Sequence, residues 1–506
     1  MFANTAHADV VIVGAGSAGC VLAERLSRDP RRRVLLLEAG PDYADMRTLP
    51  ADIADGRALA NSHDWGYRSV PGPDGHALDI PRGKLVGGSS AVNACFALRG
   101  AVGGYDGWAA AGNDGWSFAD VLPAFCATER DLDFGAQPWH GADGFLPVRR
   151  YPDHELTPLH RELLEAATRA GHATVDDHNA PGAVGAGRLP TNCVDGRRIS
   201  CALAFLGPAR CRPNLTVRAQ VLVDRVVLHH DRATGVRLAT GETVTADLVV
   251  LAAGSYGSPA ILLRSGIGPS GELRTAGVTP GLDLSGVGRG LVDHPAASID
   301  IVVDAASPTA PTFQSMVSFH SGRSPAAGPP DLQLFAGGAW PSGASRTGRV
   351  AALIVSVVQP LSSGRVWLTS PDPTAPPRID LGHLREEADR SRMVEAMRHA
   401  REIAATPPLA ASGRQQLAPG PSDWSSDAAL RRWLRRNVWT YHHPVGTCRM
   451  GPRPAEGAVV DRRGRVHGLE NVYVADASVM PAIPSANTNL PTIMVAERIA
   501  AMLVEP

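Results

Sequence analysis

ADVVIVGAGSAGCVLAERLS, residues 8–27, is the stretch that decides the fold. Its β-branched run Val10–Val13 predicts a short buried strand, and the following Gly14–Gly19 fits the pattern G-x-G-x-x-G. An apolar stripe after the glycines predicts a helix, and a second strand, Val34–Leu37, ends on Glu38. Because strand, glycine turn, helix, strand and acid follow in this order, the stretch predicts a dinucleotide-binding site rather than a plain turn.

Each conspicuous residue of this motif has its own physical task. Gly14 allows the tight turn, Gly16 lets the backbone approach a pyrophosphate, and Gly19 lets helix and strand pack closely. The free amides at the helix N-terminus then face the anion. Glu38, at the end of the second strand, can accept hydrogen bonds from ribose hydroxyls.

Two later segments indicate which dinucleotide is bound. DLVVLAAG, residues 247–254, and NVYVAD, residues 471–476, each combine a short apolar strand with small or acidic residues. A nucleotide domain assembled from three distant segments is typical of flavoproteins, because FAD is extended and draws contacts from many parts of a chain. The sequence therefore predicts FAD rather than a nicotinamide cofactor.

Composition excludes several other classes of function. The chain has 506 residues, which favours two domains, and its net charge of -1 gives no support to a nucleic-acid partner. No apolar run is long enough for a transmembrane helix, and the N-terminus lacks a signal-peptide pattern, so a cytoplasmic protein is expected. The seven cysteines form no CxxC pair, and the 17 histidines include no HExxH, so neither a disulfide framework nor a metal site is expected.

Further motifs, in a fixed order, extend over nearly the whole chain. They are GKLVGGSSAVN (83–93), GSYGSP (254–259), LVDHP (291–295), YHHPVGTCRMG (441–451), DAS (476–478) and PSANTN (484–489). In these motifs the sequence resembles the glucose-methanol-choline (GMC) oxidoreductases, a family of FAD-dependent alcohol oxidases and dehydrogenases that includes choline dehydrogenase. The resemblance implies an α/β fold, α+β overall, with a Rossmann-type FAD-binding domain and a substrate domain whose antiparallel sheet is backed by helices.

The resemblance also implies how the domains alternate along the chain. The FAD-binding domain is expected over residues 1–153, 191–295 and 439–506, the last part holding the active site. The substrate domain is expected over 154–190 and 296–438. Its strands are expected at Ser298–Val303, Asp331–Ala336, Arg349–Gln359 and Gly364–Thr369, and its main helix at Arg385–Ala405.

Together the motif and the resemblance give an expected set of FAD contacts. Some family members tether FAD through a histidine just before the position of Asn93, and because Val92 stands there, non-covalent FAD is expected. The glycine-rich run 83–93 is expected along the flavin and its pyrophosphate, and Val221 at the adenine through its backbone. The full set is Gly14, Gly16, Ser17, Ala18, Gly19, Glu38, Ala39, Arg82, Val86, Gly87, Ser89, Asn93, Ala94, Val221, Ala253, His442, Asp476, Ala477, Leu490 and Thr492.

Two residues are expected to carry the chemistry. Oxidising an alcohol removes a hydroxyl proton and a hydride; the flavin takes the hydride, and the protein must supply a base. The family's base directly precedes the Pro-Val-Gly-Thr element, which selects His443 over His442. The family's partner position, His or Asn, is matched to Asn489, whose amide would donate to the substrate oxygen; Asn487–Asn489 next to Pro491 also fits a simple turn.

The substrate and the electron acceptor are less well defined. Phe313, Phe335 and Trp340 favour a pocket for an apolar or aromatic alcohol, although aromatic residues in strands are more often core. Tyr441 stands where several family oxidases have a small residue, which favours a dehydrogenase with a quinone or another redox carrier over O2. Two alternatives stay open: a hydroxynitrile-lyase-like enzyme with a non-redox flavin, and a non-catalytic FAD scaffold.

Overall fold

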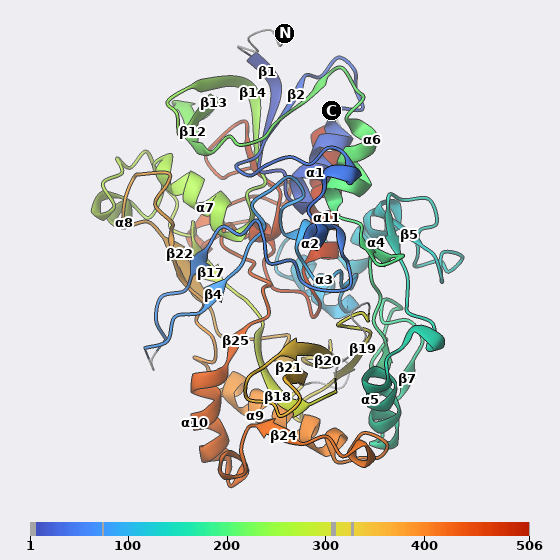
Figure 1. Ribbon diagram of the computed structural model, residues 1–506. Helices are drawn as coiled ribbons and strands as arrows, with labels where there is room; N and C mark the ends of the chain where they lie inside the picture. Colours follow the sequence, from blue (N-terminus) through green and yellow to red (C-terminus); the bar gives the residue numbers. More distant parts are fainter. Residues whose placement is uncertain (1–6, 73–74, 305–309, 325–327, 505–506) are drawn as a thin grey trace.

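The computed structural model describes residues 7–72, 75–304, 310–324 and 328–504. Two large sheets organise these residues, one around the N-terminal motif at the top of Figure 1 and one at the bottom. The first described strand and the end of the last described helix both lie at the top, so the polypeptide leaves the first sheet, builds the second, and returns. This mixed α/β architecture confirms the predicted fold class.

The first sheet is parallel where the glycine motif enters it. Its seven strands are β1 (His7–Val13), β2 (Val34–Leu37), β11 (Leu215–Arg218), β12 (Val223–His229), β13 (Arg232–Leu238), β14 (Thr243–Leu251) and β26 (Val472–Val474). β1 pairs in parallel with β2 and β14, and β14 pairs in parallel with β26. The three segments that the sequence linked to one nucleotide site therefore meet at adjacent carboxyl ends of parallel strands, the usual ligand edge of such a sheet.

Helices cover the first sheet and close its core. α1 (Ser17–Leu26) packs against α11 (Asn489–Val504), so the motif helix lies beside the C-terminal helix. Leu22, Ile12 and Ile499 are completely buried in this shared core. The burial of β1 and β2 explains why their sequences are continuous apolar runs rather than alternating ones.

The second sheet is antiparallel apart from one short edge pair. Its strands are β7 (Thr174–Val175), β8 (Gly185–Arg188), β18 (Pro295–Val302), β19 (Ser315–Phe319), β20 (Leu332–Pro341), β21 (Arg349–Val357), β24 (Gln416–Ala418) and β25 (Trp439–Thr440). One face packs on α5 (Pro158–Arg169), α9 (Glu387–Ala404) and α10 (Asp427–Asn437) around a core that includes Leu353, Met397 and Leu430. The other face looks toward the first sheet (Figure 1).

Shorter elements connect the two sheets. The helices are α2 (Ala51–Ala54), α3 (Val102–Ala110), α4 (Phe118–Thr128), α6 (Gly207–Ala209), α7 (Gly254–Arg264) and α8 (Ser270–Thr275). The strands are β3 (Tyr67–Arg68), β4 (Asp79–Ile80), β5 (Glu129–Asp131), β6 (Leu146–Val148), β9 (Cys193–Val194), β10 (Arg197–Arg198), β15 (Ile267–Gly268), β16 (Leu282–Asp283), β17 (Arg289–Leu291), β22 (Gly364–Trp367) and β23 (Arg378–Asp380).

Two expected elements differ in the structure. The strand expected near 364–369 is β22, but it belongs to a separate three-stranded sheet with β17 and β23 rather than to the substrate sheet. The C-terminal helix, for which the sequence indicates Met494–Leu503, begins at Asn489, because Pro491 is tolerated in the first turn of a helix, where its missing N–H costs nothing. This earlier start places Asn489 at the helix N-terminus, beside α1.

Among the helices of the described ranges, none combines the length and apolarity that a membrane crossing requires. The cytoplasmic location stays a prediction from the sequence.

Candidate active site

A cavity of about 1030 Å³ is lined by residues of both sheets. Most of the residues expected at the cofactor and both residues expected to carry the chemistry line it. Four expected cofactor contacts are not among the lining residues: Gly19, Val86, Gly87 and Leu490. Gly19 packs against the backbone of Gly14 and Gly87 bonds to that of Ala15, while Val86 and Leu490 are buried in the core of the first sheet.

The glycines of the N-terminal motif divide into packing and ligand positions. A Cβ on Gly14 would lie 2.6 Å from the carbonyl oxygen of Ala252, and one on Gly19 would lie 1.8 Å from that of Gly14. Both glycines are therefore required by the protein's own backbone. A Cβ on Gly16 would meet only the Cα of Gly88, at 3.9 Å, so Gly16 leaves space open toward the cavity. Gly16 and the N-terminus of α1 thus form a cradle for an anionic group.

The second glycine-rich stretch supports the first. The Gly87 amide donates to the Ala15 carbonyl at 2.7 Å, and a Cβ on Gly88 would lie 2.6 Å from the Cα of Gly16. Gly87 and Gly88 both have positive φ, +103° and +52°, which side chains rarely adopt. At these two glycines the backbone of the run 83–93 packs directly on the backbone of the N-terminal glycine motif. Some of the glycines in this run are therefore required by packing within the protein rather than by the cofactor.

Glu38 ties the turn to the second strand. Its carboxylate accepts hydrogen bonds from the amides of Ala15 and Gly40, at 2.9 and 2.8 Å, and burial raises its pKa. The Val221 amide donates to the Glu38 carbonyl at 2.7 Å, so only the carbonyl of Val221 is left for a ligand. Glu38 and Val221 line the same part of the cavity, as expected for a ribose and adenine end.

Asp476 organises another part of the wall. Its carboxylate accepts from the Gly254 amide at 2.8 Å, the Ser478 amide at 2.8 Å and the Ser258 hydroxyl at 2.5 Å, and burial raises its pKa. Asp476 therefore joins the end of β26 to the start of α7, and its carboxylate oxygens are already occupied by hydrogen bonds within the protein. Ala477, next to it, also lines the cavity.

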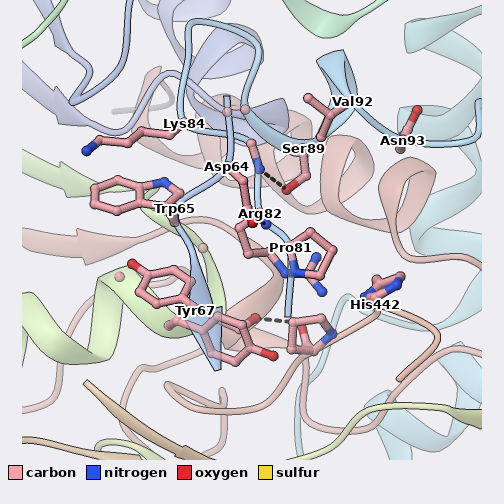
Figure 2. Close-up of a pocket in the computed structure, with 18 of the residues that line it drawn as sticks. Asp64, Trp65, Tyr67, Pro81, Arg82, Lys84, Ser89, Val92, Asn93 and His442 are labelled. Carbon is pink, nitrogen blue, oxygen red and sulfur yellow. Dashed lines mark hydrogen bonds between the residues drawn. The ribbon is translucent and has the colours of Figure 1, made fainter. Parts of the chain in front are cut away.

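Arg82 and His442 bring buried nitrogens without partners into the cavity wall. The Nε and Nη2 atoms of Arg82 and the Nδ1 atom of His442 are buried, and no described residue bonds to them. Figure 2 shows both side chains at the pocket, together with Ser89 and Asn93. Burial, followed by the charge of Arg82, lowers the pKa of His442 to about 4. Buried donors of this kind are costly unless a ligand satisfies them.

His443 is buried in the wall of the same cavity. Its Nδ1 lies 3.0 Å from Nδ1 of His294, and its amide donates to Asp293 at 2.7 Å. Burial, with the nearby His294, holds the pKa of His443 well below its usual value, so the ring is neutral at neutral pH. In the tautomer in which His443 Nδ1 donates to His294, the Nε2 lone pair is left to accept a proton.

The buried carboxylate of Asp293 interacts with the histidine segment. Burial opposes ionisation of Asp293, but the nearby His383 ring, with its Nε2 3.6 Å from the carboxylate, and a hydrogen bond from the Thr440 hydroxyl outweigh it, so its pKa is well below the usual range. Burial also lowers the pKa of His294 to about 4. Asp293 and His294 belong to the LVDHP motif, but their role beside His443 was not expected, because 149 or more residues separate them in sequence.

The two asparagines of the C-terminal motif point to different neighbours. The Asn489 Oδ1 accepts a hydrogen bond from the Ser17 hydroxyl at 2.8 Å, at the start of α1. Asn487 contacts the hydroxyl of Tyr441, whose ring centroid lies 4.3 Å from that of His443. The Oδ1 of Asn487 is buried and has no partner among the described residues. Asn487 thus contacts the tyrosine that packs beside His443.

Aromatic rings form the rest of the wall on the histidine side. Tyr441 stacks on Phe335 with centroids 5.0 Å apart, Phe335 meets Phe313 at 5.7 Å, and Phe313 meets Trp340 at 6.1 Å. Phe313, Phe335 and Trp340 all line the cavity, where the sequence placed a substrate pocket. This wall makes the environment of His443 apolar, which favours the neutral ring.

These features fit FAD. The cradle at Gly16 suits a pyrophosphate, Glu38 suits a ribose, and the unpartnered nitrogens of Arg82 suit an electron-rich ring edge. A dinucleotide cradle and a neutral histidine that share one cavity define a flavin-type oxidoreductase site.

The chain belongs to the GMC oxidoreductase family. The models of the two family domains, each described as GMC oxidoreductase, match residues 8–296 and 360–496. Proteins of this family bind FAD and are oxidoreductases acting on CH–OH groups.

Named relatives agree over nearly the full length. The chain is 37% identical to a 5-(hydroxymethyl)furfural oxidase of Methylovorus sp. (strain MP688), covering 97% of this chain and 98% of that protein. It is 34% identical to an oxygen-dependent choline dehydrogenase of Photobacterium profundum, covering 98% and 93%. The crystal structure of pyridoxine 4-oxidase from Mesorbium loti superimposes with a TM-score of 0.90 at 34% identity, covering 98% of this chain and 99% of that one.

Proposed function

We propose that this protein is an FAD-dependent oxidoreductase that converts the CH–OH group of a small-molecule alcohol to a carbonyl. The observation that carries the proposal is the position of His443: buried, neutral, and in the wall of the cavity that also holds the dinucleotide cradle. A neutral imidazole is the form that accepts a proton. The names of the relatives, which act on 5-(hydroxymethyl)furfural, pyridoxine and choline, support a small alcohol as the substrate.

The residues divide the work between cofactor and proton. Gly16, Ser17 and Glu38 would hold the nucleotide part of FAD, and Arg82 would face its ring system. FAD, when bound, supplies the acceptor for the hydride. His443 accepts the hydroxyl proton at Nε2, while its Nδ1–H donates to His294 and keeps the ring oriented.

We assign the second polar role to Asn487 rather than to Asn489. The amide oxygen of Asn489 is engaged by Ser17, at the cofactor side, whereas Asn487 lies beside Tyr441 and His443. An amide N–H from Asn487 would hold the substrate oxygen as negative charge develops on it. Asn489 would instead fix the start of α1 at the cofactor.

Two finer properties belong to the same proposal. FAD is bound non-covalently, since Val92 lines the cavity where the resemblance places a tethering histidine. The bulk of Tyr441 beside His443 favours a quinone or another redox carrier over O2 as electron acceptor. Acid denaturation tests the first property, because non-covalent FAD is released into the supernatant and tethered FAD is not.

Anaerobic flavin reduction tests the central proposal. The purified protein, loaded with FAD, is mixed with primary, secondary, aromatic and sugar alcohols while the flavin absorbance is followed. Bleaching by one class supports the proposal, and the rate at which air restores the colour measures the use of O2. A fully loaded flavin that no alcohol bleaches would instead favour the lyase-like or scaffold alternatives.

A further inference from the structure

The cavity has a second polar position, far along β18 from the histidines. Ser298 and Asp300 lie two residues apart on this strand, and both line the cavity. The residues between and beside them, Ile299 and Ile301, pack into the core beneath the helices. This alternation is the normal two-residue period of a strand, so Asp300 belongs to the cavity face by the register of the sheet.

Asp300 is a carboxyl group without a cationic partner. Its Oδ1 accepts a hydrogen bond from the Ser298 hydroxyl at 2.8 Å, and no described Arg, Lys or His pairs with it. The stretches outside the described residues contain no Arg, Lys or His side chain either. The side chain is half-buried, and burial raises its pKa, as expected for a carboxylate that lacks a cationic partner.

Two aromatic rings stand across the sheet from Asp300. Asp300 pairs with Ala352 of β21, and Ala352 pairs with Gly337 of β20. A Cβ on Gly337 would lie 2.4 Å from the ring of Phe313 and 2.8 Å from that of Trp340, so both rings lie over this glycine. Two strand spacings, roughly 10 Å, therefore separate the backbone at Asp300 from the backbone beneath the rings, with the small Ala352 between them.

This arrangement suits a cation. A carboxylate supplies the counter-charge, aromatic rings attract a positive group, and the small residues at the base leave room for it. The carboxylate of Asp300 would repel an anionic group of a substrate. An alkyl group placed there would remove water from the carboxylate without supplying a hydrogen bond or a counter-charge in its place.

The strand register also gives an approximate separation between Asp300 and the start of the histidine segment. Asp300 is four residues along β18 from Ala296, which pairs with Trp439 next to the histidine segment. Four residues of strand span roughly 13 Å. The aromatic wall from Trp340 through Phe335 to Tyr441 bridges the same interval.

We propose that the cavity selects an alcohol with a cationic nitrogen at the end remote from its hydroxyl, with Asp300 as counterion and Phe313 and Trp340 as the facing wall. The inference rests on the proposed function and specifies its substrate class. Ser298 orients the carboxylate, and the aromatic wall holds the apolar middle of the molecule.

The test compares primary ω-amino alkanols of increasing length, each against the neutral 1-alkanol of matched length, by anaerobic flavin reduction. At neutral pH the amine is protonated. The ratio of kcat/KM, amine over alkanol, should rise with length to about tenfold or more, as for a charge-assisted hydrogen bond. In Asp300→Asn the ratio should fall to about one, mainly through KM. The matched control is Asp304→Asn, an exposed carboxylate just beyond β18, which should keep the wild-type ratio.

Three further outcomes keep the inference and the proposed function separate. If neutral alcohols bleach the flavin and the amines do so no better at any length, the inference is wrong while the function stands. Equal ratios in Asp300→Asn and Asp304→Asn also overturn it. If no alcohol bleaches the flavin, a long n-alkylamine is titrated into the FAD-loaded protein, and binding is followed by difference absorbance. The inference then requires that the amine binds Asp300→Asn with a Kd about tenfold weaker than it binds the wild type. If Asp300→Asn fails to fold, Asp300→Ser replaces it.

Discussion

The pKa values of two buried histidines, His443 and His140, are shifted in opposite directions. Burial and a neighbouring histidine lower the pKa of His443, whereas His140 has a raised pKa although burial opposes it. His140 bonds to Glu129 at 2.7 Å and to Asp177 at 2.9 Å. Burial alone therefore does not decide whether a histidine is charged; the charges that were buried with it do.

The formal charges of the buried groups around His140 sum to zero only if His140 is protonated. Three buried carboxylates, Glu129, Asp131 and Asp177, meet two buried guanidiniums, Arg99 and Arg150. A positive His140 makes the sum of these five charges and its own zero, and each of the three carboxylates already pairs with one of the two arginines. This cluster joins β5 to the loop after β7, so its role is structural.

His443 has the opposite surroundings. The one nearby carboxylate, Asp293, also interacts with His383 and Thr440. His294, His442 and Arg82 further lower the pKa of His443, because each of them disfavours a positive charge on its ring. The ring is kept neutral in an apolar cavity wall, ready to accept a proton. The same residue type thus has a raised pKa in one cluster and a lowered pKa in the other.

Removing the base should have the largest effect. We expect His443→Ala to lower the rate constant for flavin reduction by alcohol about 10³-fold, within the range of general-base catalysis. FAD absorbance and content should stay at the wild-type level, because the cradle at Gly16 lies elsewhere in the cavity. Stopped-flow absorbance measures the rate; reduction at the wild-type rate would contradict the assignment.

Breaking the charged cluster should damage stability rather than chemistry. Arg150→Met leaves Asp131 and Asp177 without their guanidinium, and we expect a loss of about 3–5 kcal/mol in the free energy of unfolding. Denaturant unfolding followed by tryptophan fluorescence measures it. Per mole of bound FAD, flavin reduction should change little. The exposed Arg68→Met, which breaks a surface pair with Asp79, is the matched control.

The two asparagines should separate in their effects. We expect Asn487→Ala to slow flavin reduction about 10- to 100-fold with FAD still bound, as for the loss of one donor to a developing oxyanion. Asn489→Ala should mainly weaken FAD binding, because it releases Ser17 at the cradle. Titration of the apoprotein with FAD and stopped-flow reduction separate the two. A slower chemical step only in Asn489→Ala would restore the assignment made from the sequence.

The pH dependence of the activity should follow the lowered pKa of His443. Because that pKa is lowered, the base stays neutral down to pH values below about 6.5, so flavin reduction should show no acidic loss above that pH. Rates measured from acidic to basic pH in one buffer series test this. An acidic limb centred above pH 6.5 would show that His443 is protonated more easily than its surroundings indicate.

The smallest expected effect concerns His140. A raised folded-state pKa contributes stability that is fully present below the unfolded value of about 6.5 and is lost as pH rises through the folded pKa. The melting temperature should therefore fall by a few degrees as the pH rises from about 6.5 through the folded-state pKa of His140. The variant His140→Gln should lack this step, and a step of equal size in the variant would exclude His140 as its source.

Local sequence patterns determined much of this protein. The order of strand, glycines, helix and acid over residues 8–38 is a local property of the chain, and so is the Pro-Val-Gly-Thr element that singles out His443. Such patterns are visible because backbone sterics and capping act between near neighbours. They were enough to predict the α/β fold and the family, and most of the residues that they single out for the cofactor and the chemistry line the cavity.

Tertiary structure decided what the patterns could not. The sequence could not tell that Gly87 and Gly88 pack on the backbone of the first motif, or that Asn489 bonds to Ser17 while Asn487 contacts Tyr441. These choices depend on where α11 begins and on which strands are neighbours. The pKa of His443, the neutral balance around His140 and the lone charge of Asp300 likewise arise from groups far apart in sequence, because electrostatic energies depend on distance and burial in space rather than on chain order.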